Sequence, residues 1–329
     1  MTTQPSAPVS LPPLPQGLAP LPHLGVIRAR GEEAAAFLQG QLSNDVQLLK
    51  PGQARLAAYC SPKGRVLAAF IVYKEPAQVE GQSPDLLLVC ARDLLAATLK
   101  RLSMFVLRAK VKLSDASDDY RLFGFAGTHP ALAGLAPEPW TGAALPTAGA
   151  AIRLQAAAGQ PRALLIAPAG DGPVLADAAE QATADWLWLD TLAGVPLVSN
   201  AVTDQFVPQM LNYESTGGVN FKKGCYPGQE VVARSQFRGT LKRRLYIVQS
   251  PVPLQAGQDV LQGPKADEIT GLVVQSAPVP QAEAALWLAN VSVQIAAVES
   301  TEGLYVTGPD GQFAPLMLIE RPYDLLQDI

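Results

Sequence analysis

The sequence predicts an α+β fold in which two interlocked α+β halves are followed by a C-terminal β-barrel. A strand–helix–strand–strand pattern begins near Gly25 and begins again near Tyr120. After Gly239 the pattern changes to short β-type segments separated by proline and glycine turns, which is typical of a barrel. The 329 residues, of which 48% are hydrophobic, suffice for two or three domains with substantial cores.

The first half has the clearest patterns. Glu32 and Glu33 open a helical stretch, where their carboxylates interact favourably with the helix dipole. Two apolar strands flank the turn at 61–64 and predict a hairpin. In chain order we expect a strand over 24–31, a helix over 32–42, the hairpin over 54–75, a strand over 85–91, and a helix followed by a strand over 91–111.

The second half repeats this style with weaker signals. Residues 127–150 are rich in glycine, proline and alanine and indicate a loop or a weak helical insert. The residues Gly194 to Pro196 mark the end of a helix. In chain order we expect strands over 120–127 and 162–168, helices over 173–182 and from 185 to that stop, a short helix over 205–214, and barrel strands over 243–250, 269–277, 284–293 and 303–308.

Composition argues against several classes of protein. The formal charge of −4 disfavours a general nucleic-acid binder, and no apolar run is long enough to span a bilayer, so neither RNA nor a membrane is an expected partner. Three cysteines without a CxxC pair predict a reducing compartment rather than a disulfide framework. With only two histidines, the chain has few ligands for a zinc site, and its three cysteines are fewer than the four thiolates that an iron–sulfur cluster usually needs, so we expect neither a zinc site nor a permanently bound cluster.

The N-terminal residues 1–22 are uncharged and rich in proline. They lack the basic start and the unbroken apolar centre of a secretory signal, so we expect a disordered tail on a cytoplasmic protein. The expected organisation is therefore this tail, an α+β region of two interlocked subdomains over 23–239, and the barrel over 240–329.

The stretch over 218–239 carries the strongest chemical signal. Cys225 follows Lys222 and Lys223 and precedes a helix that we expect to start at Gln229. Ammonium groups and a helix start both stabilise a thiolate, so this cysteine is predicted to be a reactive thiol.

Other residues near this thiol, and the other two cysteines, have simpler interpretations. Gly224 and Gly228 would let the backbone approach a ligand closely. Cys60 and Cys90 lie in apolar strands and are expected to be buried and inert.

A basic run follows the thiol. Together with Lys222, the cations near this loop could form an anion site for a polyglutamate tail or a phosphate. Arg234 could instead simply pair with Glu230, four residues earlier on the helix. The run consists of Arg234, Arg238, Lys242, Arg243 and Arg244.

Two tryptophans, Trp186 and Trp188, precede the helix stop. On a helix, residues two apart lie about 200° apart, so one ring would face a pocket and the other the core. A pterin-like ring would bind against such an aromatic wall.

The sequence KGCYPGQEVVAR, over 223–234, resembles the signature of the YgfZ family of folate-binding proteins, which are relatives of the glycine-cleavage aminomethyltransferase, or T protein. Weaker similarity in the segments FLQGQLSNDV, AGVPLV and QFVPQMLNYESTGGVNF extends the resemblance over most of 24–245. The signature positions are Lys223, Gly224, Cys225, Tyr226, Gly228, Gln229, Glu230, Ala233 and Arg234, followed by FRG at 237–239.

This resemblance implies a three-part fold around a central tetrahydrofolate pocket, with 23–239 as an aminomethyltransferase-like, folate-binding region. It implies a role in assembling or maintaining iron–sulfur clusters and a link to tRNA modification. Cys225 would be the family cysteine, and Trp186 matches one of two tryptophans associated with folate binding. The second falls at Leu24, and Leu192 stands where folate-dependent relatives often carry a pterin-binding glutamate.

A further departure concerns catalysis. The T protein has an acidic pair in its hairpin and uses one aspartate in its reaction, whereas this chain has Ala68 and Ala69 there. Alanine cannot position or relay a proton, so aminomethyl transfer by that mechanism is not expected.

Three hypotheses follow, and the first is the leading one. It is a folate-binding accessory protein for iron–sulfur clusters, with cluster-carrying client enzymes or assembly proteins as partners. The alternative is a tetrahydrofolate-dependent one-carbon transferase. The third, an RNA-binding module built on the basic run, agrees least with the net charge.

Overall fold

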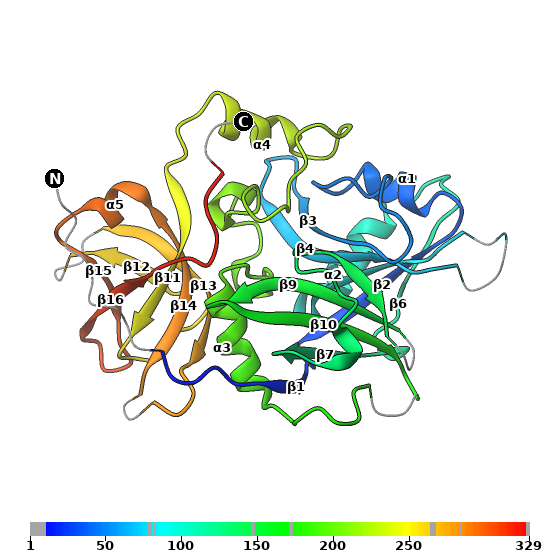
Figure 1. Cartoon of the computed structure of the whole chain (residues 1–329). Coiled ribbons are helices and arrows are strands. Elements are labelled where there is room, and N and C mark those ends of the chain that lie inside the picture. Colours follow the sequence, from blue (N-terminus) through cyan, green and yellow to red (C-terminus); the bar gives the residue numbers. More distant parts are fainter. Residues whose placement is uncertain are drawn as a thin grey trace.

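The computed structural model describes residues 11–77, 81, 83–145, 149–170, 174–263, 268–282 and 285–326. Residues 1–10 of the predicted tail lie outside this part of the chain. The described chain forms two five-stranded sheets and a closed six-stranded barrel, which confirms the predicted fold class (Figure 1). None of the described helices has the length and apolar character needed to cross a membrane.

The first sheet has the strand order β3-β4-β5-β2-β6, with every neighbouring pair antiparallel. The interior strand β4 is buried along most of its length, and its sequence is accordingly a nearly continuous apolar run. Five strands and helices were expected from the sequence at these places, and α1 was expected as part of a longer helix. The strand expected at the end of 91–111 was misplaced: residues 104–111 form turns and irregular chain, and the strand follows them. The elements are β2 (Leu24–Arg30), α1 (Ala34–Gln39), β3 (Ala54–Cys60), β4 (Val66–Lys74), β5 (Leu86–Ala91), α2 (Arg92–Ser103) and β6 (Lys112–Asp115).

The second sheet has the order β1-β7-β10-β9-β8. Within the predicted insert over 127–150 the chain forms a short 3₁₀ turn and the strand β8, and the sequence also gave no signal for β9. The elements are β1 (Gly17–Pro20), β7 (Tyr120–Ala126), β8 (Gly142–Ala144), β9 (Ala150–Ala157), β10 (Gln160–Pro168) and α3 (Thr183–Ala193).

The prediction of a helix over 173–182 was wrong for the described residues 174–182, which form turns and extended chain. The amide of Leu18 donates to the carbonyl of Ala179, and the amide of Gln181 donates to the carbonyl of Leu18. Pairing with β1 therefore overrides the helix preference of this alanine-rich segment.

The strand β1 interlocks the two halves. Residues 17–20, which the sequence analysis placed in a disordered tail, pair with β7 of the second sheet. The next strand, β2, joins the first sheet instead. The start of the chain is therefore a structural part of the second half, and Ala19 is fully buried there.

The barrel has the order β11-β14-β13-β12-β15-β16 and is closed by pairing between β11 and β16. The strands β12 and β16 were not predicted: the first is short, and Pro315 interrupts the strand pattern of the second. The elements are β11 (Arg243–Ser250), β12 (Asp259–Gln262), β13 (Ile269–Pro278), β14 (Trp287–Gln294), α5 (Ile295–Glu299), β15 (Leu304–Thr307) and β16 (Phe313–Ile319).

Between α3 and the barrel the chain is mostly irregular. The short helix expected over 205–214 is a 3₁₀ turn at Pro208–Leu211. The helix expected from Gln229 is α4 (Gln229–Phe237).

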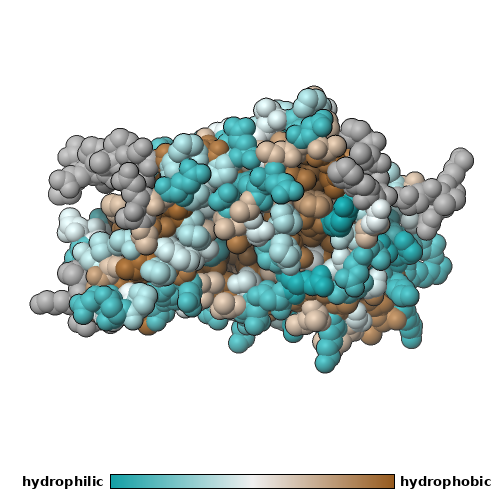
Figure 2. All heavy atoms as spheres, turned by 90° about the horizontal axis from the view of Figure 1, so that it is seen from below, coloured by the Kyte–Doolittle hydropathy of each residue, from teal (hydrophilic) through white to brown (hydrophobic). Residues whose placement is uncertain are grey.

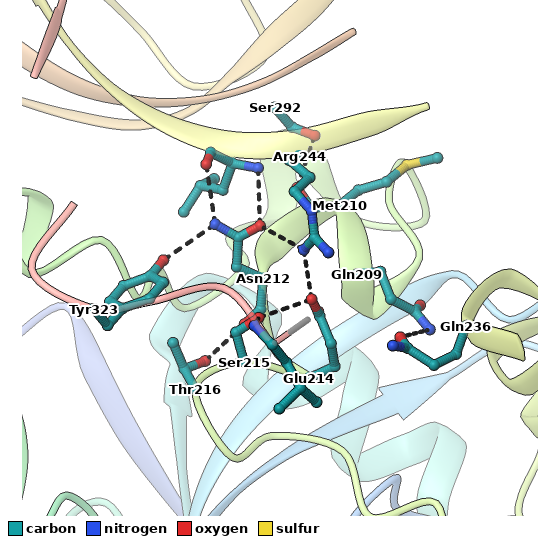
Figure 3. A network of polar contacts seen from close by, with 12 residues as sticks. Gln209, Met210, Asn212, Glu214, Ser215, Thr216, Gln236, Arg244, Ser292 and Tyr323 are labelled. Carbon is teal, nitrogen blue, oxygen red and sulfur yellow. Dashed lines mark hydrogen bonds and ion pairs between the residues drawn. The ribbon is translucent and has the colours of Figure 1, made fainter. Parts of the chain in front are cut away.

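A buried polar network fastens the barrel to the rest of the molecule (Figure 3). The side chain of Asn212 donates to the carbonyl of Leu245 and accepts from its amide. Beside it, Arg244 of β11 forms an ion pair with Glu214 at 2.5 Å, and the Glu214 side chain is fully buried. Asn212 has a positive φ of 56°, a conformation that asparagine tolerates better than most residues.

The ion pair gives a prediction about stability. Replacing Arg244 by Leu leaves the buried Glu214 carboxylate without its partner, so we expect a loss of about 3–5 kcal/mol in the free energy of unfolding. Chemical denaturation measures this loss. The neighbouring change Arg243→Leu should cost less than about 1 kcal/mol, and Glu214→Gln combined with Arg244→Leu should recover much of the loss. Equal losses in Arg244→Leu and Arg243→Leu would contradict the role of the ion pair between Arg244 and Glu214.

Candidate functional site

The three parts of the fold enclose a cavity of about 560 Å³. Most of its wall is apolar, with a few polar side chains, as is usual for small-molecule sites. The underside of the molecule shows apolar residues gathered around a hollow near its middle (Figure 2). The first half contributes Ile71, Ala91 and Arg92, the second Leu154, Arg162 and Trp186, and the barrel Ala256, Val274, Gln275 and Ser276.

Trp186 lines this cavity, whereas Trp188 is fully buried and does not. This is the division expected for residues two apart on a helix. The ring of Trp186 packs so closely on β7 that a Cβ atom at Gly124 would lie 2.3 Å from it. The guanidinium of Arg162 lies 4.4 Å from the ring centroid, so the indole forms a wall that already carries a cation–π contact.

Asp190 supplies a carboxylate to the cavity wall. It lies four residues after Trp186, on the same side of α3, and its Oδ1 accepts a hydrogen bond from the guanidinium of Arg162. Arg162 is 1% exposed and Asp190 23%, so the pair is shielded and the carboxylate remains partly accessible. Leu192, by contrast, is buried and brings no polar group.

The sequence analysis predicted none of the polar residues of the wall, among them Asp190, Arg162 and His23. Asp190 could have been found from its i, i+4 spacing to Trp186. Arg162 gave no signal, because only the pairing of β10 beside β7 brings it under the indole. His23 directly follows the predicted tail and carried no predicted role, yet it lines the cavity, and burial lowers the pKa of its imidazole despite the opposing effect of Asp190. His23 is therefore neutral at neutral pH.

Cys225 is exposed, while Cys60 and Cys90 are buried, as predicted. The helix α4 starts four residues after Cys225, so the thiol lies in the loop before the helix rather than in its first turn. Burial raises the pKa of both Cys60 and Cys90 to about 12, so Cys225 is the thiol available for chemistry at neutral pH.

Lys223 holds the cysteine loop against α1. Its ammonium donates to the carbonyls of Gln39 and Leu42, the latter at 2.6 Å, and lies 4.9 Å from the centroid of the Tyr226 ring. Burial lowers the pKa of Lys223 to about 8, against the attraction of Asp45 and Cys225. The lysine therefore remains largely charged at neutral pH.

The signature glycine Gly228 has a packing role that the sequence analysis did not predict. A Cβ at Gly228 would lie 2.4 Å from the carbonyl oxygen of Ser61 and 2.6 Å from the Cα of Gly64, and φ at Gly228 is 78°. This glycine lets the loop dock on the turn between β3 and β4. Gly224 has no atom within 4 Å of an added Cβ, so nothing packs against it.

The remaining signature residues have local partners. The Gln229 side chain donates to the carbonyl of Lys223 at 3.4 Å, and Tyr226 is buried, which raises the pKa of its hydroxyl. Arg234 pairs with Glu230 at 2.6 Å, as the simpler interpretation expected.

The residues of the basic run lie in different environments, and two of them, Arg234 and Arg244, are in ion pairs. Arg244 is buried in the ion pair with Glu214, while Lys222, Arg238 and Lys242 are exposed. None of these residues lines the cavity, and neither does Cys225. The thiol and the cavity are therefore separate sites. Among the described residues, no group of three or more His, Cys, Asp and Glu side chains is placed to bind a metal ion.

The two sheets and the closed barrel define the class of T-protein-like folds. The chain matches the crystal structure of the glycine cleavage system aminomethyltransferase T from Bartonella henselae with a TM-score of 0.67, over 95% of this chain and 87% of that chain. The sequence identity is 18%, so this likeness establishes the fold.

Within this class, the chain belongs to the YgfZ family. It is 34% identical over 274 residues to the tRNA-modifying protein YgfZ of Klebsiella pneumoniae (strain 342), covering 78% of this chain and 79% of the relative. It is 33% identical over 270 residues to the protein of that name from Cronobacter sakazakii, covering 78% of each chain. A scan against models of known protein families found no match.

The cysteine loop gives a prediction about reactivity. Of the three cysteines, one should react rapidly with a thiol reagent in the native protein, and all three should react in denaturant. Lys223→Met should slow the alkylation of Cys225 at pH 7 by roughly fivefold, the effect of one partly screened charge of about 1 kcal/mol. Stopped-flow measurements with a chromogenic disulfide would test this.

The pH dependence has a defined sign. Lys223 is charged below its pKa of about 8 and neutral above it. The ratio of wild-type to Lys223→Met rates should therefore be largest below pH 8 and approach one as the pH rises above it. A ratio that does not change with pH would exclude the ammonium as the cause.

Proposed function

We propose that this chain is a cytoplasmic, folate-binding accessory protein that helps to assemble or repair iron–sulfur clusters in client enzymes. The single observation that carries the proposal is an apolar cavity between all three parts of the fold, accompanied by an accessible thiol outside it. The curated relatives are named as tRNA-modifying proteins. Since some tRNA-thiolating enzymes carry iron–sulfur clusters, we propose an indirect link to tRNA modification through such clients.

The cavity residues fit a reduced folate. A volume of about 560 Å³ lies within the roughly 300–1,000 Å³ usual for sites of such ligands. The Asp190 carboxylate can accept hydrogen bonds from the amino and ring N–H groups of a pterin, and the edge of Trp186 can pack against its ring. Arg92, which is exposed and lines the cavity, can pair with the carboxylates of the glutamate tail.

The role proposed for Cys225 is transient ligation. A thiolate is a good ligand for iron, but one cysteine cannot hold a cluster alone. The other ligands would come from the client or from an assembly protein. The cluster is thus cargo rather than a resident group.

The alternative, a one-carbon transferase of the T-protein type, has less support. The strand β4 contributes Ile71 to the cavity wall, and Ala69, two residues earlier, shares its side of the strand. Ala68 and Ala69 are both buried and bring no carboxylate to this wall. Turnover of an aminomethyl donor by the purified protein would favour this alternative over the accessory role.

Titration with tetrahydrofolate tests the cavity. We expect saturable quenching of tryptophan fluorescence in the wild type, and Trp186→Phe should remove most of that change. Asp190→Asn should weaken binding by roughly tenfold or more, because it replaces a charged hydrogen-bond acceptor. Trp287→Phe, in the barrel and outside the cavity wall, is the matched control. If the wild type does not bind tetrahydrofolate, the proposed folate site is wrong, although the fold assignment stands.

Complementation tests the thiol. In cells that lack the protein, Cys225→Ala should fail to restore the activity of iron–sulfur enzymes under oxidative stress, because the cluster loses its thiolate ligand. Cys90→Ala, which removes a buried thiol, is the control and should restore it. Full restoration by Cys225→Ala would exclude the proposed role of the cysteine.

A further inference from the structure

A group of exposed apolar side chains lies on segments that α1 holds together. Leu107 is 88% exposed, Leu48 75%, Met104 60% and Phe105 46%. A folded protein does not usually leave large apolar side chains this exposed in one region unless something covers them.

Hydrogen bonds place these segments at the two ends of α1. At its start, Glu32 pairs with the Lys110 ammonium at 2.5 Å and Glu33 accepts from the Lys110 amide, which fixes the turn after α2. At its end, the side chain of Gln39 accepts from the amides of Val46 and Gln47, next to Leu48. We call the exposed surface of Leu48, α1 and residues 103–110 the α1 face.

The cysteine loop adjoins this face. Lys223 donates to the carbonyls of Gln39 and Leu42, at the same end of α1 as Leu48. In Figure 1, α1 and α4 lie along the same upper side of the molecule. Because α1 has six residues and spans about 9 Å, a partner of ordinary interface size that covers the α1 face would also reach Cys225.

The segment that supplies three of the four apolar residues is basic, whereas the whole chain is acidic. Residues 94–114 contain five basic residues and no acidic one, although the chain carries a net charge of −4. The nearby acidic residues Glu32 and Glu33 are already engaged with Lys110. The free cationic character comes from the exposed Lys100, Arg108 and Lys112.

The backbone also holds one of the apolar residues in an unfavourable conformation. Leu107 has a positive φ of 41°, which is uncommon for a leucine. Its side chain packs against little of the chain, since it is mostly exposed. Strained positions that packing does not explain tend to occur where a surface meets a partner.

We propose that the α1 face docks an acidic protein surface with an apolar patch, and that this docking brings the partner to Cys225. The inference rests on the proposed function, in which a client meets the thiol. The apolar residues come from two segments at opposite ends of α1, which suits a broad protein surface better than insertion of one tip into a membrane. Proteins that bind single-stranded RNA usually stack several aromatic side chains on successive bases, whereas Phe105 is the single aromatic residue among these four.

A binding measurement tests the docking directly. The probe is a purified tRNA-thiolating enzyme that carries a [4Fe–4S] cluster, and the protein is used as the full chain. Leu107→Asp should weaken binding by about thirtyfold or more, as for a central interface residue, and Lys112→Glu should weaken it and reduce its dependence on salt. The matched controls are Phe313→Asp and Lys242→Glu, which are exposed residues outside the α1 face.

Three outcomes would overturn the proposal. They are no binding by the wild type, equal binding by all variants, and binding to anionic phosphatidylglycerol vesicles or a tRNA transcript that Leu107→Asp abolishes. The first two would exclude a protein docking site on the α1 face. The third would mean that the face binds a lipid surface or RNA rather than a protein.

Complementation then separates this inference from the proposed function. Leu107→Asp should fail to restore iron–sulfur enzyme activity while its tetrahydrofolate titration and Cys225 alkylation rate stay at wild-type values. If Cys225→Ala fails and Leu107→Asp succeeds, the docking site is wrong and the thiol role stands. If Cys225→Ala succeeds, the proposed role of the thiol is wrong, and the binding measurement alone decides the docking site.

Discussion

The buried contact between Glu214 and Arg244, with Asn212 beside it, is the constraint on which the cavity depends. One wall of the cavity comes from β13 and the loop before β12 in the barrel, whereas the others come from the two sheets. A barrel that moved against the sheets would open this space to water. Directional polar contacts fix the relative position of the parts more strictly than apolar packing, which tolerates sliding. The cost of burying a carboxylate and a guanidinium is offset by their mutual pairing and by the side-chain oxygen of Asn212, which accepts a hydrogen bond from Arg244.

The sequence was most informative where local pattern and tertiary role agree. The strongly apolar strands β3 and β4, the turn between them and the helix α3 were all found, because each carries its own periodicity and breakers. The strand β9 was missed because alanine-rich segments occur in helices and strands alike. The helix predicted for residues 174–182 was wrong for the same reason. In the cavity, Trp186 could be found from its type and Asp190 from its spacing, but Arg162 and His23 are brought there by pairings between distant segments.

The main structural role of the family signature is to hold the cysteine loop against the first half of the fold. Lys223 binds the end of α1, and Gly228 docks on the turn between β3 and β4. Both contacts shape the loop so that Cys225 points to solvent rather than into the cavity. The physical separation of thiol and cavity means that a bound folate would act on the thiol's chemistry through the packed first half, not by touching the sulfur. The buried strand β4, with Ile71 in the cavity wall and the hairpin turn under Gly228, connects the two sites.

The crossing of β1 into the second sheet has a consequence for biosynthesis. β1 leaves the ribosome before its partner β7, which begins 100 residues later, at Tyr120 after Pro20. At about 5–20 residues per second, the nascent strand waits roughly 5–20 seconds for that partner. The barrel wall of the cavity is made later still. The cavity is therefore completed only when the barrel has been synthesised and folded.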